Sequence, residues 1–359
     1  MITLSEIAHN VHTSLAGSIS SGILLIVTEM TIIGVILIAS AVLLSFFLGY
    51  MERKVAGFMQ LRLGPNRVGP KGSLQIVADT VKLLFKEGLT PNASDKFLFN
   101  AAPVIMVITT MCVLAPIAYA SGFQIWDTNI GVLYVSSISS ISVIGILMAG
   151  WSSNNKYSLL GAMRCGAQIV SYELSIGLAL ISIVVLTGSL KISDIVMSQA
   201  DGWWIFKGHI PVVISFVIFI IASTAEINRA PFDLAEAESE LTAGFHTEYS
   251  GMKFAMFLLS EYINLFIVAA MGATLFLGGW MPLHFGVDNG FNHVMDYVPG
   301  FVWFFGKTFL LIFIIMWFRW TFPRLRIDQL LNLEWKYLLP ISMVNLLLTT
   351  LIAIMGWHF

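Results

Sequence analysis

One short segment gathers acidic side chains between two long apolar runs. Between residues 224 and 241, five carboxylates lie within fifteen residues: Glu226, Asp233, Glu236, Glu238 and Glu240. Coupled carboxylates in a poorly hydrated site cannot all ionise at low cost, so they share protons and can pass them on. This pattern favours proton relay. A solvated connection at a membrane surface, where acids carry no penalty, is the alternative.

The spacing of these charges is helical over part of the segment. If the segment is a helix, steps of three and four residues place one stripe of charges on a single face, formed by Glu226, Arg229, Asp233, Glu236 and Glu240. Glu238 points elsewhere. Pro231 must interrupt or begin a helix, so we expect the stripe to be broken there.

Two more acids stand inside apolar runs. Glu173 follows Gln168 and Tyr172 within the first two turns of one run, and Glu261 lies about two turns into another. A carboxylate at membrane depth costs several kcal/mol unless it is paired, hydrated or protonated. Such residues normally face the interior of a helical bundle, so two of them suggest a hydrated route.

The elements that must position these acids are membrane helices. The chain is 57% hydrophobic and 11% charged, against about 25% charged residues in ordinary soluble domains. Runs of roughly 17 to 25 apolar residues can cross the hydrocarbon. We predict an all-α integral membrane protein, one polytopic domain over residues 1–359, with amphipathic surface helices and eight spans: 24–49, 97–120, 131–151, 166–188, 210–225, 254–280, 300–320 and 337–357.

The basic residues predict the orientation of these spans. Lys and Arg near membrane ends favour the cytoplasmic side. If both termini lie outside, all but three of the 19 basic residues fall in inside connections, the exceptions being Lys191, Lys207 and Lys307. An odd number of spans would spoil this bias. Residues 1–20 lack the features of a cleaved signal, and we expect a short helix on the outer surface there.

Two inside connections are long. The one over 51–96 contains glycines and prolines that enforce turns, followed by Ser73 as the expected N-cap of an amphipathic helix. That helix is either a basic surface helix attracted to anionic lipid or a lid over a cavity. The second connection is the acidic loop over 225–253.

Several kinds of chemistry find no support. Cys112 and Cys165 belong to no metal-ligand or redox spacing, and the seven histidines lie in connections or at termini, so no pair could clamp a haem. Phosphate loops and dinucleotide fingerprints are absent. We expect no redox centre, no metal, no nucleotide hydrolysis and no nucleic-acid partner.

Five motifs carry a family resemblance. They are ERKVAGFMQLRLGPNRVGP (52–70), SNNKYS (153–158), QIVSYE (168–173), AEINRAPFDLAEAESEL (225–241) and PRLRIDQL (323–330). Together they closely resemble the H-subunit family of proton-translocating NADH:quinone oxidoreductase, respiratory complex I. The resemblance covers nearly the whole chain from about residue 25 and includes eight spans.

The resemblance implies a subunit that walls part of a quinone tunnel, while neighbouring hydrophilic subunits hold the terminal iron–sulfur cluster and the quinone head. Hydrophilic and small membrane subunits, lipid and quinone are the implied partners. By motif position, Arg62, Asp79 and Arg319 resemble tunnel-lining residues, and Arg229 would pair with acids. The residues that resemble an acidic path toward the membrane-arm pumps are Glu173, Glu226, Asp233, Glu236, Glu238, Glu240, Glu248 and Glu261.

Other functions stay open at this point. The membrane subunit of a related energy-converting hydrogenase would keep the acids but bind no quinone, and a stand-alone proton-coupled transporter would use the same acids without partners. The resemblance implies a bacterial inner membrane, or a mitochondrial inner membrane if the protein is organellar. Ubiquinone and menaquinone cannot be distinguished from these residues.

Overall fold

A computed structural model describes residues 22–233, 242–284 and 290–356. Within these ranges, eight helices are long and apolar enough to cross a membrane, which confirms the predicted all-α architecture and the number of spans. They are α2 (Gly22–Met59), α4 (Lys96–Leu114), α5 (Gly131–Ser152), α6 (Lys156–Thr187), α9 (His209–Glu226), α11 (Gly251–Phe276), α13 (Gly300–Thr321) and α15 (Leu339–Met355).

Shorter elements lie between the spans. They are the 3₁₀ turn η1 (Pro70–Gly72), α3 (Gln75–Phe85), strands β1 (Ala118–Ala120) and β2 (Phe123–Gln124), α7 (Ile192–Met197), α8 (Trp204–Lys207), the 3₁₀ turn η2 (Gly244–His246), α12 (Gly290–Asp296), α14 (Ile327–Leu333) and the π-helical turn η3 (Glu334–Leu338). Strands β1 and β2 pair antiparallel as a small hairpin. Because α14, η3 and α15 are continuous, the last span covers Ile327–Met355.

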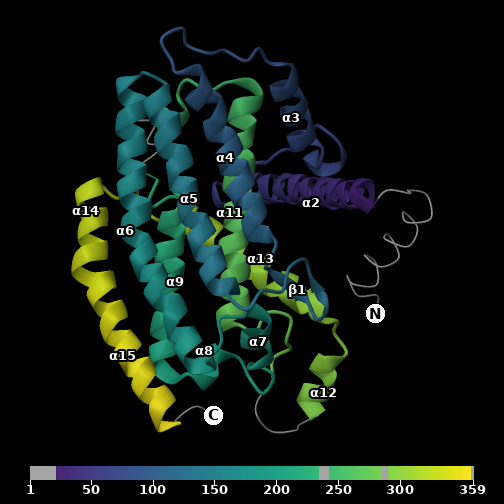
Figure 1. The fold of residues 1–359 in the computed structure, drawn as a ribbon, viewed down its shortest axis with the longest axis vertical. Coiled ribbons are helices and arrows are strands. Elements are labelled where there is room, and N and C mark those ends of the chain that lie inside the picture. Colours follow the sequence, from purple (N-terminus) through teal and green to yellow (C-terminus); the bar gives the residue numbers. More distant parts are fainter. Residues whose placement is uncertain (1–21, 234–241, 285–289, 357–359) are drawn as a thin grey trace.

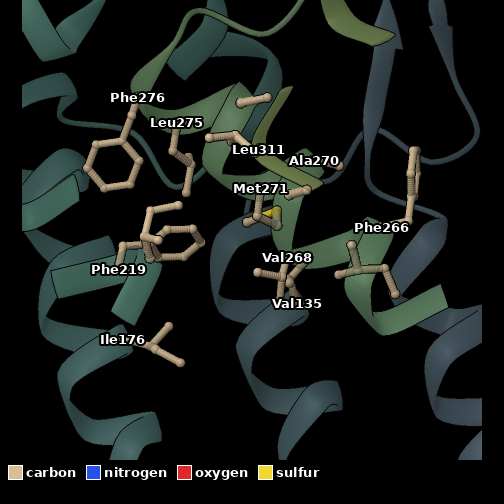
Figure 2. Packing of buried hydrophobic residues seen from close by; sticks show 14 of the residues in the cluster. Val135, Ile176, Phe219, Phe266, Val268, Ala270, Met271, Leu275, Phe276 and Leu311 are labelled. Carbon is tan, nitrogen blue, oxygen red and sulfur yellow. The ribbon is translucent and has the colours of Figure 1, made fainter. Parts of the chain in front are cut away.

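Helix α11 is the centre of the bundle. Every residue from Leu265 to Phe276 is buried, as expected for a helix that is apolar on all sides. Figure 2 shows Met271, Leu275 and Phe276 packing with Phe219 of α9 and Leu311 of α13. Helices α5 and α6 run beside one another along the long axis, whereas α2 lies across the view at a large angle to them (Figure 1).

Two helices extend well beyond their predicted limits. Helix α2 continues to Met59 rather than ending at residue 49, because no glycine–proline pair interrupts it before Gly64 and Pro65. Helix α6 begins at Lys156 rather than 166, where the Asn155 side chain caps it by accepting a hydrogen bond from Tyr157 N at 2.9 Å. Glu173 therefore lies near the middle of α6 and not in its first two turns.

The other ends also shift. Helix α4 ends at Leu114 rather than 120, because the chain turns at Pro116 into the hairpin, and α11 covers 251–276 rather than 254–280. The amphipathic helix is present as α3, but its N-cap is Leu74 and not Ser73. The predicted N-terminal surface helix falls outside the described residues.

The predicted acidic stripe is not one continuous helix. Helix α9 ends at Glu226, and residues 227–233 form turns, with Asn228 at a φ of 51°. Arg229 N donates to Thr224 O at 3.3 Å, so the chain folds back on the end of α9. Glu236, Glu238 and Glu240 lie outside the described residues.

Candidate functional site: three cavities that share carboxylates

A charged cavity lies between α2, the loop after it, α11 and α13. This arginine cavity has a volume of about 460 Å³. Its charged lining residues are Glu52, Arg53, Arg62, Glu261 and Arg319. Because three guanidiniums face two carboxylates, the charged lining carries a net positive charge. Of the predicted tunnel residues, Arg62 and Arg319 line this cavity.

Arg229 holds the carboxylates behind this cavity. Its side chain is 2% exposed, and its guanidinium lies 2.6 Å from Glu52 Oε1 and 2.9 Å from Glu261 Oε1. It also stacks over the ring of Tyr262, 5.1 Å from the centroid. Burial alone would lower the pKa of Arg229, but the charges of Glu261 and Glu52 outweigh burial and raise it. This arginine stays charged and pairs with both acids.

Glu52 receives a second cation from α13. Arg319 donates a hydrogen bond to Glu52 Oε1, the oxygen that also pairs with Arg229. One buried carboxylate of α2 is thus shared between the turn after α9 and the end of α13. A change in charge inside the arginine cavity can therefore act on Arg319, Glu52, Arg229 and Glu261 together.

A much smaller cavity adjoins the first one. This small cavity has a volume of about 50 Å³, and Leu258 and Glu261 line both, so it has room for a few water molecules. Its other polar residues are Ser142, Glu226, Asn228, His246 and Asn264. The carboxylates of Glu226 and Glu261, from different helices, therefore face one space that is large enough for water.

A third cavity continues from the end of α9. This glutamate cavity has a volume of about 650 Å³, and the residues that it shares with the small cavity are Ser142, Glu226, Ile227 and Asn264. Glu173 lines it from α6 and accepts a hydrogen bond from Ser140 of α5. Three serines at helical spacing on α5, Ser136, Ser139 and Ser142, face the same space. The rest of the lining is mainly aliphatic.

The three cavities form a series joined by acids. Glu261 borders the first and second, Glu226 borders the second and third, and Glu173 stands in the third. Carboxylates that border a shared polar space can exchange protons through intervening water. The series thus combines the two elements that a proton path needs, namely carboxylates and space for water.

Not every predicted residue lines these cavities. Asp79 of α3 forms an ion pair with Arg53 at 2.5 Å, and so acts on the arginine cavity only through that residue. Asp233 pairs with Arg324 at 3.3 Å. Glu248 accepts a hydrogen bond from Asn155 Nδ2 at 2.6 Å, at the start of α6. These three acids therefore line none of the three cavities.

Sequence reasoning did not assign several lining residues. Glu52 lies in one of the five motifs, but the motif did not predict its role, and His246 was considered only as a residue of a connection. The cavity-lining serines of α5 could have been recognised in the sequence, because three hydroxyls at steps of three residues are unusual for a helix that faces lipid. Tyr262 and Asn264 follow Glu261 closely in the sequence and belong to the same helix.

Matches to known proteins identify the family of this chain. The model of the family described as NADH dehydrogenase matches residues 30–350. The chain belongs to this family. It is 56% identical to the H subunit of NADH-quinone oxidoreductase from Bacteroides fragilis over 359 residues, which is all of both chains. It is 48% identical to the same subunit from Brevibacillus brevis, over 88% of this chain and 93% of the relative.

Membership in this family confirms the resemblance drawn from the five motifs, and the relatives' names favour it over the hydrogenase and stand-alone transporter alternatives. The chain is a membrane subunit of NADH-quinone oxidoreductase, and so part of an enzyme whose redox centre need not lie in this chain. Within the described ranges, no group of three or more His, Cys, Asp or Glu side chains could hold a metal ion.

Proposed function

We propose that this chain walls part of the quinone-binding tunnel and carries an acidic path that couples quinone reduction to proton translocation. The observation that carries the proposal is the series of three cavities joined by Glu261 and Glu226. The arginine cavity is the quinone end of this series, and Glu173 stands at the far end. Electrons reach the quinone from neighbouring hydrophilic subunits.

The charge of the arginine cavity suits a quinone that is being reduced. Adding electrons to a quinone gives an anionic species until protons arrive, and guanidiniums stabilise developing negative charge. Arg62 and Arg319 border the cavity directly. Arg319 also binds Glu52, so an anion that attracts Arg319 weakens its hold on this carboxylate.

The coupling step follows from that competition. When Arg319 turns toward an anionic quinone, Arg229 is left as the cation that holds Glu52, and its hold on Glu261 weakens. A less strongly paired Glu261 can turn toward the water of the small cavity, which leads from it to Glu226. The two ligand states must favour different arrangements of these ion pairs for coupling to occur.

The membrane placement is also part of the proposal. Most basic residues lie in the connections after the first, third, fifth and seventh spans or in the adjoining helix ends, which supports both termini lying on the outer, periplasmic side. Relatives from bacteria support a bacterial inner membrane. Helix α3, tied to α2 through Asp79 and Arg53, would then lie at the inner surface, as a lipid-bound helix or as a lid beside the arginine cavity.

Labelling with a photoreactive quinone analogue tests the quinone end. In the assembled complex, illumination should attach the analogue to residues of the arginine cavity in α2, in the 62–65 loop or at the end of α13. An excess of unlabelled quinone should suppress this attachment. Labelling confined to the lipid-facing side of α15, unaffected by competitor, would refute the assignment.

Neutralising the end acids tests the path. In the complex with Glu173→Gln or Glu261→Gln, proton pumping should fall about tenfold and quinone reduction should fall with it, since an amide cannot carry the proton but leaves room for water to bridge in part. Both rates are measured in proteoliposomes. Wild-type values for both variants would exclude the path.

A further inference from the structure

The small cavity is the smallest of the three, and one of its polar side chains has no role so far. His246 belongs to the 3₁₀ turn η2 and lines the cavity together with Glu226 and Glu261. Its ring packs edge-on against Phe245, with centroids 4.9 Å apart, and at a tilt against Phe254, with centroids 5.4 Å apart. The aromatic rings fix the plane of the imidazole.

We propose that His246 is a positioning residue of the proton path, which orients the water that joins Glu261 to Glu226 by hydrogen bonding as a neutral imidazole. This inference rests on the proposed function and names the group that completes its middle step. The other polar residues of the cavity, Ser142, Asn228 and Asn264, are neutral as well. The two acids are thus the charged lining groups of this cavity, and the hydrogen-bonding shell around them is uncharged.

The packing of His246 beside the face of α11 that carries Glu261 supports this role. Phe254, Leu258, Glu261 and Asn264 recur at helical spacing and present one face of α11 to the cavity. Glu226 closes the cavity from the end of α9. The η2 turn inserts His246 against this face, where Gly244 lies at the surface of α6 beside Gly161, with no room for a Cβ. The turn is therefore held close to the bundle.

The chemistry of the buried imidazole indicates a hydrogen-bonding group and not a charge carrier. Neutral imidazole presents one N–H donor and one nitrogen acceptor, which is what a water between two acids needs for alignment. Burial lowers the pKa of His246 to about 4, so the imidazolium is rare near neutral pH.

An apolar side chain at position 246 should therefore impair the path, whereas a polar side chain that does not titrate should support it. In the assembled complex, His246→Leu should lower proton pumping and quinone reduction about tenfold, the scale of losing a hydrogen-bonded water link. His246→Asn should stay within about twofold of the parent, because the amide also donates and accepts. Both rates are measured in proteoliposomes and normalised to the amount of assembled complex.

Two further variants supply a matched histidine control and an aromatic replacement of His246. His284→Asn is the matched control, since His284 pairs with Asp296 and with the carbonyl of Ala200, away from the three cavities, and it should retain parental rates. His246→Phe, which keeps an aromatic ring, should fail as His246→Leu does. Where a variant assembles poorly, both rates measured in the assembled fraction alone give the same comparison between the amide and apolar side chains.

The possible results separate this inference from the function on which it rests. If His246→Leu pumps at parental rates while Glu226→Gln does not, the acid path stands and the role of His246 is overturned. If His246→Asn loses as much as His246→Leu, the ring must exchange protons itself, and the neutral role is overturned. Parental rates for both Glu226→Gln and Glu261→Gln would instead remove the proposed function.

Discussion

Replacement of Glu226 by Gln is expected to lower proton pumping about 100-fold, at the lower end of what a positioned proton-transfer group contributes. Glu226 is the one carboxylate that lines both the small cavity and the glutamate cavity among the described residues. Its amide analogue keeps the shape of the side chain and removes the exchangeable proton. A block here stops transfer in both directions, so quinone reduction in the coupled complex should fall in parallel.

A fully buried acid outside the cavities serves as the control for this experiment. Glu334 is 0% exposed and accepts a hydrogen bond from Ser175, but it lines none of the three cavities. Glu334→Gln should retain at least about half of the parental rates, since the amide can still accept from the serine hydroxyl. Equal losses in both variants would show that any buried acid matters for assembly, and would argue against a path through Glu226.

The second large effect concerns Arg229. Arg229→Met leaves the carboxylates of Glu52 and Glu261 without the cation that lies 2.6 and 2.9 Å away. Removing one partner of a buried ion pair costs about 3–5 kcal/mol, because the remaining charges stay desolvated. We expect a sharp fall in the amount of assembled complex and in the temperature at which its quinone reductase activity is lost.

Neutralising the acid that is left without a cation should reverse part of this loss. Glu52 keeps its hydrogen bond from Arg319, so adding Glu261→Gln to Arg229→Met removes the uncompensated charge, and stability should recover in part even though coupling does not. Lys191→Met is the surface control: Lys191 pairs with a part-exposed Asp127 at 2.7 Å, and such pairs contribute less than about 1 kcal/mol. If the double variant were no more stable than Arg229→Met, charge desolvation would not be the cause.

The helical core of the fold was readable from composition. An apolar run long enough to cross the hydrocarbon must satisfy its own backbone hydrogen bonds, so it forms a helix whatever its neighbours are. That is why all eight spans were predicted. The ends were not, because polar residues such as Glu52 and Lys156 can continue a helix out of the apolar layer, and only a cap or a breaker stops it.

The site was predicted less completely than the fold. Intramembrane acids are conspicuous because of their cost, and Glu173, Glu226 and Glu261 do border the connected cavities. The charged stripe was expected to break at Pro231, and α9 ends slightly earlier, at Glu226, before the turn at Asn228. Asp79, Asp233 and Glu248 have the right residue type, but they pair with other residues and line none of the cavities.

The sequence by itself determined a bundle of eight membrane helices with ionisable side chains inside it, because both properties follow from local composition and from the cost of leaving polar groups in an apolar medium. Tertiary structure alone decided which charges meet. Glu52 and Arg319 are separated by 267 positions along the chain yet share a hydrogen bond. Each cavity is lined by residues from several helices. Such contacts depend on how helices pack, which no short stretch of sequence encodes.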